Sequence, residues 1–188
     1  MLGLSADLAL YSIGFIASAI TFFYLLGLIG SQVAERLEAP MISGTVVAVG
    51  IVLVTVEYLR IRSNDVCSIG LRRQTPKALG RSPGGVILWG LDTGLPFTTI
   101  RATLLPLYGV ILVTIGLGGG LAAGTGYGIG FLLALWAACL AKGNGSTTDT
   151  VRWTTILLSL RPYVRVVGLV SVAVSSGILA LPLLNMVR

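Results

Sequence analysis

The stretch WGLDTGLPFTTIRATLLP, residues 89–106, decides how the middle of this chain folds. It places one aspartate, one arginine, four threonines and two prolines inside the apolar region 85–118. One perpendicular membrane-spanning helix needs about 20 residues, and two crossings with a turn need about 40 or more. The region falls between these lengths. We therefore expect either one long, interrupted crossing or a re-entrant segment followed by a crossing.

The composition of the whole chain is that of a membrane protein. Of its 188 residues, 55% are hydrophobic and only 11% are charged, and the mean hydropathy is +0.94. Soluble domains carry about 25% charged residues. The N-terminus, MLGLSADLAL, lacks the basic region of a cleaved signal peptide, so we expect the first apolar segment to be retained. The sequence predicts an all-α, polytopic membrane helix bundle in which residues 1–188 form a single transmembrane domain.

Apolar segments and polar connections alternate along the chain. The expected membrane segments are 8–30, 41–59, 85–118, 127–141 and 162–184. The expected connections are 31–40, the basic loop 60–84, the glycine-rich stretch GLGGGLAAGTGYG at 116–128, and the loop 142–161 with a short interfacial helix over 151–160. If 85–118 crosses once in net terms, the chain makes about five crossings and contains one broken helix.

The distribution of basic residues orients these segments. The net charge is +6, and loops facing the cytoplasm carry an excess of lysine and arginine. With one net crossing over 85–118, the loops 60–84 and 142–165 lie on the same side and hold most of the basic residues. We therefore expect a multi-pass protein of the cell membrane with a cytoplasmic N-terminus and an extracytoplasmic C-terminus. The basic residues are not interleaved with aromatic ones, so nucleic acid is not an expected partner.

The charges in the middle segment form the candidate site. In a continuous helix, Asp92 and Arg101 would lie about 13.5 Å apart along the axis and on opposite faces. Gly94 and Pro96 interrupt that helix and let the two charges approach, which matters because an unpaired charge at mid-bilayer costs about 2.5–3.5 kcal/mol. The candidate substrate or ion-binding residues are Asp92, Thr93, Pro96, Thr98, Thr99 and Arg101.

Two interpretations of this site stay open. A discontinuous helix can line a small-solute or ion site, as in many transporters. Alternatively, the charges form a structural ion pair that fixes a kinked helix. A second charged pair, Glu57 and Arg60, lies three residues apart on one helical face near the end of the second segment.

Other chemistry is sparse. Histidine is absent, which removes the commonest general base. The two cysteines, Cys67 and Cys139, form no CxxC motif, and we expect unlinked thiols. No catalytic triad, metal-ligand set or paired carboxylates are visible. We therefore expect no metal and no cofactor, and an enzyme is a less favoured interpretation than the functions given below.

Three stretches carry a resemblance to a known family: GVILWGLDTGLPFTT, LAAGTGYGIGFLLALW and LRPYVRVVGLVSVAVSSGILAL. Over about residues 80–182 the chain resembles the second half of the thiol–disulfide carriers of cytochrome c biogenesis, of the CcdA and DsbD membrane-domain type. The resemblance implies a broken helix at the start of this half. The carriers have a Pro-Cys pair there, whereas this chain has Pro96 followed by Phe97, Thr98 and Thr99. Their cysteine chemistry is therefore not carried over.

Three functions follow as hypotheses. The first is a transport or channel component for a small solute or ion, acting at the broken helix. The second is a non-catalytic accessory or assembly subunit of a larger membrane complex. The third is a redox carrier that uses Cys67 and Cys139. Five crossings are few for a complete carrier, so besides the lipid bilayer we expect either a homo-oligomer or another membrane subunit as partner.

Overall fold

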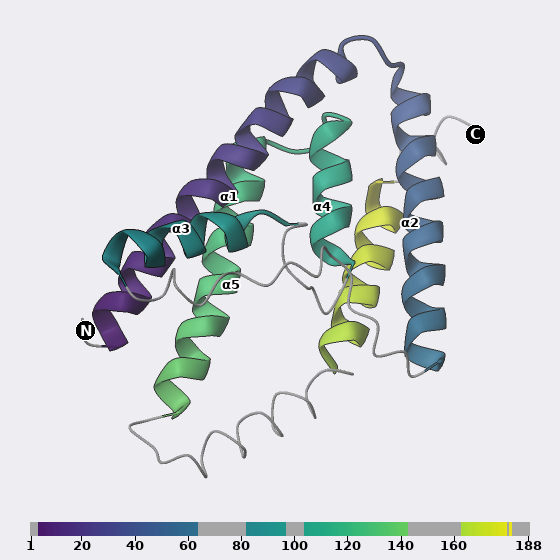
Figure 1. The fold of residues 1–188 in the computed structure, drawn as a ribbon. Helices are drawn as coiled ribbons and strands as arrows, with labels where there is room; N and C mark the ends of the chain where they lie inside the picture. The colour runs from purple at the N-terminus through teal and green to yellow at the C-terminus, as the bar shows by residue number, and fades with distance from the viewer. Residues whose placement is uncertain (1–3, 64–81, 97–103, 143–162, 180, 182–188) are drawn as a thin grey trace.

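The protein is all-helical over the part of the chain that the computed structural model describes, which is residues 4–63, 82–96, 104–142, 163–179 and 181. Five helices are labelled in Figure 1: α1 (Leu4–Ala34), α2 (Ala39–Arg62), α3 (Pro83–Gly94), α4 (Leu105–Thr114) and α5 (Gly120–Lys142). A sixth, Tyr163–Leu179, follows, and we call it the C-terminal helix. No strand occurs in these ranges, so the predicted all-α class is confirmed.

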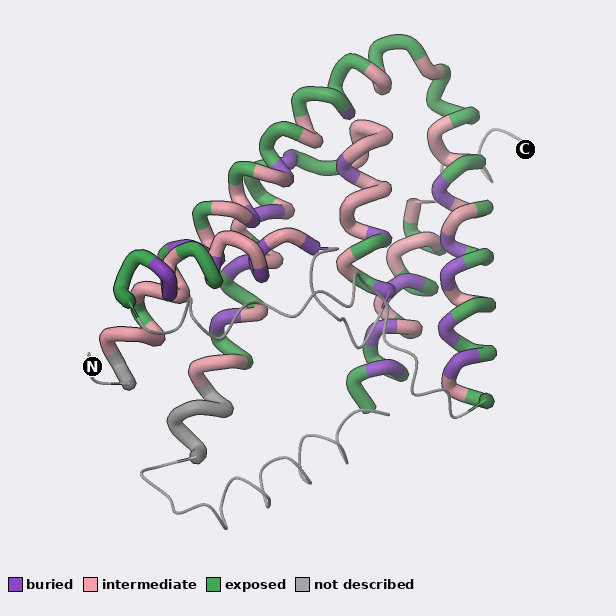
Figure 2. Tube along the Cα trace, viewed as in Figure 1, coloured by how far each residue is buried: buried purple, intermediate pink, exposed green. Residues whose placement is uncertain are grey.

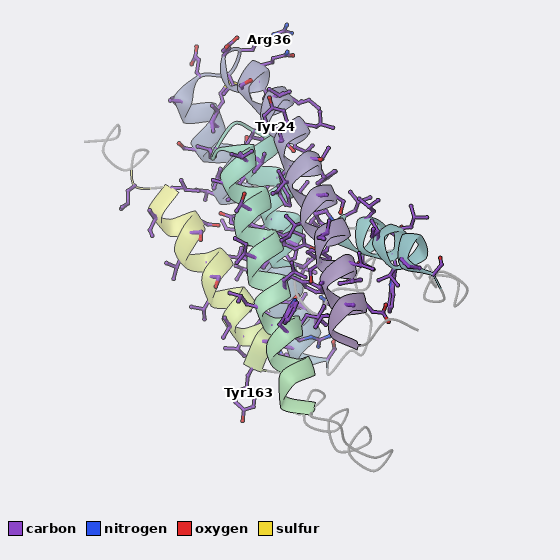
Figure 3. The ribbon with its side chains drawn as sticks, turned by 90° about the vertical axis from the view of Figure 1, so that its left-hand side faces the viewer. Tyr24, Arg36 and Tyr163 are labelled. Atoms are coloured by element: carbon purple, nitrogen blue, oxygen red, sulfur yellow. The ribbon has the colours of Figure 1, made fainter. Side chains whose placement is uncertain are left out.

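The long helices run in alternating directions between two ends of the molecule (Figure 1). α1 rises obliquely and meets α2 only at the top of the view, from where α2 descends on the right; α4 rises, α5 descends beside α1, and the C-terminal helix rises. The short helix α3 lies across α1 rather than along it. Figure 3 shows that Arg36, between α1 and α2, lies at the end opposite Tyr163, where the C-terminal helix begins.

Two helices are long and apolar enough to cross a membrane. α1 has 31 residues and α2 has 24, so they measure about 46 Å and about 36 Å, against a hydrocarbon core of about 30 Å. Both extend beyond the expected segments 8–30 and 41–59. The chain itself buries only 28% of the most apolar window of α1 and 17% of that of α2. Helices in the core of a soluble protein are mostly buried, whereas the chain leaves most of these two windows uncovered.

The predicted interruption in the middle of the chain is present. α3 ends at Gly94, Leu95 is extended and Pro96 forms a turn. The next described helix, α4, begins at Leu105 and has a proline in its first turn. α3 has 12 residues and α4 has 10, so neither alone reaches the length of about 20 that a crossing needs.

The expected glycine-rich connection over 116–128 is wrong in its extent. α5 already begins at Gly120, which leaves only residues 115–119 between α4 and α5. Gly116 and Gly118 adopt φ angles of +80° and +110°, which side chains disfavour, and they make the turn. Gly120, Gly124 and Gly128 pack against α1, and this tertiary contact overrides the low helix propensity of glycine.

Small residues bring α1 close to α3 and α5. A Cβ atom added at Gly14 would overlap the carbonyl oxygen of Ile87 on α3. A Cβ atom added at Gly124 would lie 2.8 Å from the Cα atom of Ile20 and 2.9 Å from the carbonyl oxygen of Ala19. Such close backbone approach is typical of helix packing in membranes.

Aromatic side chains complete the packing around α1. The rings of Phe15 and Phe131 stack with centroids 4.3 Å apart, and Tyr127 lies 5.8 Å from Phe15 and 5.7 Å from Phe23. Phe15 and Phe23 are almost fully buried. Offset or tilted aromatic contacts at these distances add to the stability that burial itself provides.

A second packed group forms from α2, α4 and the C-terminal helix. Its core consists of Leu53, Leu104, Tyr108 and Val172. On α2 the buried residues recur along the side that faces these neighbours, while the opposite side is exposed (Figure 2). The molecule therefore has one cluster centred on α1 and another centred on α4. The expected interfacial helix over 151–160 and most of the basic loop 60–84 lie outside the described residues.

Candidate functional site

The predicted site residues on α3 are held against α1. Thr93 is buried, and its hydroxyl bonds to the Tyr11 hydroxyl at 2.7 Å and to the Trp89 carbonyl oxygen at 2.9 Å. The Trp89 ring meets the Tyr11 ring edge-on at 5.4 Å. Thr93 therefore fixes the last turn of α3 to α1. This is a packing role, and a ligand is not needed to explain it.

The other predicted residues divide into two groups. Asp92 is half-buried in the last turn of α3, and Pro96 is buried just beyond it. Thr98, Thr99 and Arg101 lie outside the described residues. The predicted pairing of Asp92 with Arg101 therefore stays a prediction.

A groove of about 340 Å³ lies beside the end of α3. Leu91 and Leu95 of α3 form one wall. α1 forms the other, with Ala17, Ser18, Thr21, Phe22 and Leu25. The lining is apolar apart from two hydroxyls, and one of these, on Ser18, already donates to the carbonyl oxygen of Phe15 at 3.2 Å. The groove therefore offers no charged group to a ligand.

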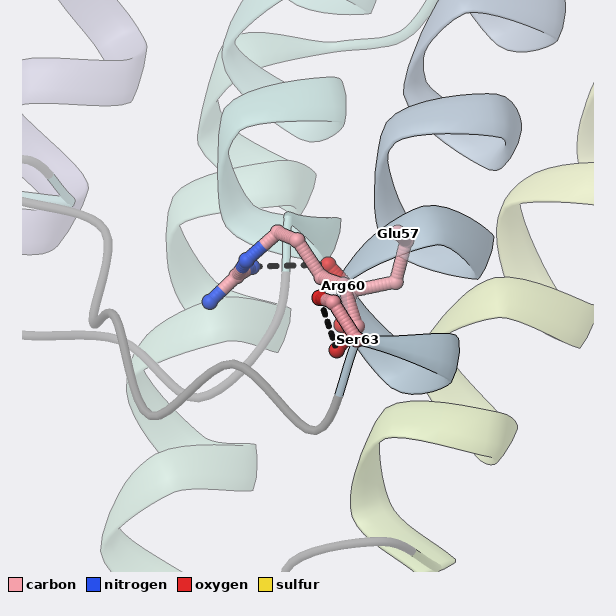
Figure 4. A network of polar contacts seen from close by, with 3 residues as sticks. All are labelled: Glu57, Arg60 and Ser63. Atoms are coloured by element: carbon pink, nitrogen blue, oxygen red, sulfur yellow. Dashed lines mark hydrogen bonds and ion pairs between the residues drawn. The ribbon is translucent and has the colours of Figure 1, made fainter.

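A buried charged pair on α2 lies apart from the predicted set. Glu57 is 2% exposed and Arg60 is 9% exposed. Nη1 of Arg60 donates to Oε2 of Glu57 at 2.8 Å, and Ser63 caps the same turn by donating to the Arg60 carbonyl oxygen at 3.4 Å (Figure 4). The other carboxylate oxygen, Oε1, is buried and accepts no hydrogen bond from any described residue.

Glu57 also lines a narrow cavity where three helices meet. α2 contributes Leu53, Val54 and Glu57, α4 contributes Leu104 and Leu105, and the C-terminal helix contributes Gly168, Leu169 and Val172. The space between these side chains does not admit a water-sized sphere. Every lining residue except Glu57 is apolar or glycine.

A third charge, Arg165, lies close to this level of the bundle. Gly50 of α2 abuts Ser176 of the C-terminal helix, and Glu57 shares the cavity with Gly168. The step of about two turns from Gly50 to Glu57 along α2 therefore corresponds to a step of about two turns from Ser176 back to Gly168 along the C-terminal helix. Continuing this antiparallel register by one turn brings Arg165, which is 5% exposed, to the level of Arg60.

A neutral polar contact lies about two turns above the charges. The hydroxyls of Tyr108 on α4 and Ser176 on the C-terminal helix are 2.7 Å apart and share a hydrogen bond. Tyr108 is 2% exposed. The absence of a side chain at Gly50 leaves room for Ser176, so all three helices meet at this contact.

Sequence reasoning missed this cluster for a physical reason. The (i, i+3) spacing of Glu57 and Arg60 was visible and is confirmed by their ion pair. Arg165, by contrast, counted only as a loop charge, because charges at the ends of apolar segments are usually solvated. Its burial follows from the antiparallel register of two helices that lie far apart in sequence.

The remaining predicted chemistry is untested. Cys67 lies outside the described residues, and Cys139 falls in α5. Within the described ranges no group of three His, Cys, Asp or Glu side chains could hold a metal ion. Comparisons of the chain with protein-family models, curated proteins and solved structures find no match.

Proposed function

We propose that the chain is a multi-pass protein of the cell membrane that acts as a transport or channel component for a small solute or ion. One observation carries this proposal. The chain leaves helical geometry after Gly94, and its first described residue before α4, Leu104, lines the same cavity as Glu57. Non-helical backbone at membrane depth is tolerated only where protein or water surrounds it. Transporters place their sites at such interruptions.

The proposed topology has five crossings. α1, α2, α5 and the C-terminal helix each cross once, and α3 and α4 together make one interrupted crossing. The alternating directions of the helices support this assignment (Figure 1). The basic end of α2, with Arg60 and Arg62, lies at the same end of the molecule as the start of the C-terminal helix (Figure 1). The positive-inside rule then places this end and the N-terminus in the cytoplasm.

The interruption would supply the binding chemistry. In this proposal Asp92 binds a cation or proton, or Arg101 holds an anion, and threonine hydroxyls satisfy backbone groups that the break exposes. A homo-oligomer or another membrane subunit completes the pathway, because five crossings are few for a carrier. From the resemblance to the cytochrome c biogenesis carriers this proposal takes only the broken helix, and not their cysteine chemistry.

Flux from reconstituted vesicles tests the proposal. The purified chain in phosphatidylcholine–phosphatidylglycerol vesicles is assayed for efflux of rubidium and chloride and for osmotic swelling in glycerol. We expect at least one flux to exceed that of protein-free vesicles and to return to that background in Asp92→Asn. Glu38→Gln, at an exposed position, is the matched control and should keep the flux. No flux above background, or normal flux through Asp92→Asn, would contradict the proposal.

One observation favours the second candidate, an accessory or assembly subunit. The cavity beside Glu57 does not admit a water-sized sphere, as expected where three helices pack together without leaving a passage for a solute. In that case Glu57→Arg and Arg60→Glu should each reduce the amount of folded protein. The double variant should restore it. Stable single variants together with loss of flux would favour the transport component instead.

A further inference from the structure

We propose that α3 lies in the lipid–water interface of the cytoplasmic leaflet, and that its outward edge, Leu88 and Trp89, binds the headgroup region of phospholipids. The inference rests on the proposed membrane location and orientation, and not on transport. α3 turns its smallest residues inward. A Cβ atom added at Gly90 would overlap the carbonyl oxygen of Tyr11, and Gly94 is buried as well. Leu88 and Trp89, by contrast, are 54% and 42% exposed. A helix covered by water turns its bulky apolar side chains inward, so this arrangement fits a lipid cover.

Aromatic residues with a polar group gather where α3 crosses α1. The Trp89 ring meets the Tyr11 ring at 5.4 Å. The next residue of α1, Ser12, accepts a hydrogen bond from the indole of Trp136 on α5 at 3.0 Å. α1, α3 and α5 therefore each present a tyrosine or tryptophan at one level of the bundle. Tryptophan and tyrosine are enriched in belts at the two membrane–water interfaces. This level is therefore a membrane boundary.

The other half of the molecule agrees with this boundary. Tyr58 near the end of α2 and Tyr163 at the start of the C-terminal helix are 54% and 69% exposed, and these helix ends lie toward the same end of the molecule as the start of α1 (Figure 1). From Tyr11 to its last residue, α1 measures about 35 Å, and α2 measures about 29 Å from its first residue to Tyr58. Both lengths are close to the hydrocarbon thickness of about 30 Å.

The indole of Trp89 offers a hydrogen-bond donor to the lipid. The N–H group of Trp136 is taken by Ser12, whereas that of Trp89 donates to no described residue. The ester and phosphate oxygens of phospholipids are acceptors in the interface, and the hydrocarbon interior supplies none. An unsatisfied donor in an apolar environment is costly, whereas the interface suits an amphipathic ring with one wet end.

This placement makes α3 a shallow re-entrant segment. One net crossing between α3 and α5 is kept, because α4 rises away from the interruption (Figure 1). Asp92, in the last turn of α3, then lies at the cytoplasmic mouth of the proposed pathway.

The depth of Trp89 in the bilayer tests the proposal. The full chain with Trp136→Phe and Trp153→Phe keeps Trp89 as its sole tryptophan. It is reconstituted in phosphatidylcholine vesicles brominated either near the headgroup end of the acyl chains or near their methyl end. We expect the shallow bromines to quench Trp89 more strongly than the deep ones. Stronger quenching by the deep bromines, or quenching by aqueous iodide alone, would overturn the proposal.

A second position calibrates the depth. In a chain with all three tryptophans replaced by phenylalanine, Tyr24→Trp places the probe about 20 Å beyond Tyr11 along α1, at a side chain that is 48% exposed. We expect the deep bromines to quench this probe more strongly. No lipid quenching at either position would contradict the membrane location itself. A shallow Trp89 without flux in the vesicle assay would support the interfacial helix and contradict transport. Flux with a deep Trp89 would support transport and overturn the interfacial helix.

Spin labelling gives a measurement that keeps every tryptophan, since Trp136→Phe loses its bond to Ser12. The label is attached to Leu88→Cys in a chain with Cys67→Ser and Cys139→Ser. Ile51→Cys is the matched deep position, because it is 61% exposed and lies about 10 Å before Tyr58 along α2. A water-soluble nickel chelate should reach position 88 more than position 51, and dissolved oxygen should show the opposite order. Equal accessibility, or the reverse order, would overturn the proposal.

Discussion

Replacement of Gly124 by alanine should destabilise the bundle, whereas the same replacement at Gly126 should not. Both residues are helical glycines of α5, two positions apart. A Cβ atom at position 124 would meet the Ile20 Cα atom at 2.8 Å, the Ala19 carbonyl oxygen at 2.9 Å and the Phe23 Cβ atom at 3.1 Å. A Cβ atom at position 126 has nothing within 4 Å.

The expected magnitude follows from comparing the two variants. Both gain about 0.8–1.0 kcal/mol of helix propensity, and this gain cancels in the difference between them. What remains is overpacking against backbone atoms that cannot rotate away, about 1–3 kcal/mol. The unfolding equilibrium constant of Gly124→Ala should therefore exceed that of Gly126→Ala by about 5-fold to 160-fold.

Equilibrium unfolding in mixed micelles, followed by circular dichroism, measures this difference. Gly126→Ala is the matched control, since it carries the same chemical change on the same helix. Two variants of equal stability would refute the reasoning, because the close approach of α5 to α1 would then not exist. A less stable Gly126→Ala would refute it equally, since that face would have to be in tight contact.

Three further predictions concern contacts between helices, each measured by the same unfolding assay. Tyr108→Phe should lower the free energy of unfolding by about 0.6–1.7 kcal/mol, because it removes the hydrogen bond to Ser176; an unchanged stability would exclude that bond. Gly50→Ala should cost about 1–3 kcal/mol by overlap with the Ser176 side chain, and in a chain that already carries Ser176→Gly the same change should cost little; an equal cost in both backgrounds would argue against the contact. Thr93→Val and Tyr11→Phe should each cost about 0.5–1.5 kcal/mol, and the double variant should cost little more than one alone; full additivity would mean that the two hydroxyls do not interact.

Local signals in the sequence were enough to predict the helical class and the break in the middle. Gly94 and Pro96 stop a helix by themselves, and α3 ends at Gly94. The length of the apolar runs predicted where α1 and α2 begin and end to within a few residues. These features depend on neighbours in sequence, so sequence reasoning reaches them.

The start of α5 and the buried charges depend on contacts between distant residues. Gly120 and Gly124 were expected to belong to a connection because glycine disfavours helices, yet their contact with α1 makes them helical. Arg165 was assigned to a loop, and only its register against α2 shows that it is buried. Glu57 and Arg60 were recognised as a pair, but the cavity beside them requires Leu104 from α4 and Gly168 from the C-terminal helix.

Side-specific cysteine labelling tests the membrane topology most directly. In a chain with Cys67→Ser and Cys139→Ser, single cysteines are introduced as Ala39→Cys, Ser63→Cys and Tyr163→Cys. All three positions are exposed, and the first two lie at opposite ends of α2. A membrane-impermeant maleimide applied to inverted, cytoplasm-out vesicles should label positions 63 and 163 and leave position 39 unlabelled. Labelling of positions 39 and 63 from the same side would mean that α2 does not cross the membrane, and it would contradict the proposed five-crossing bundle.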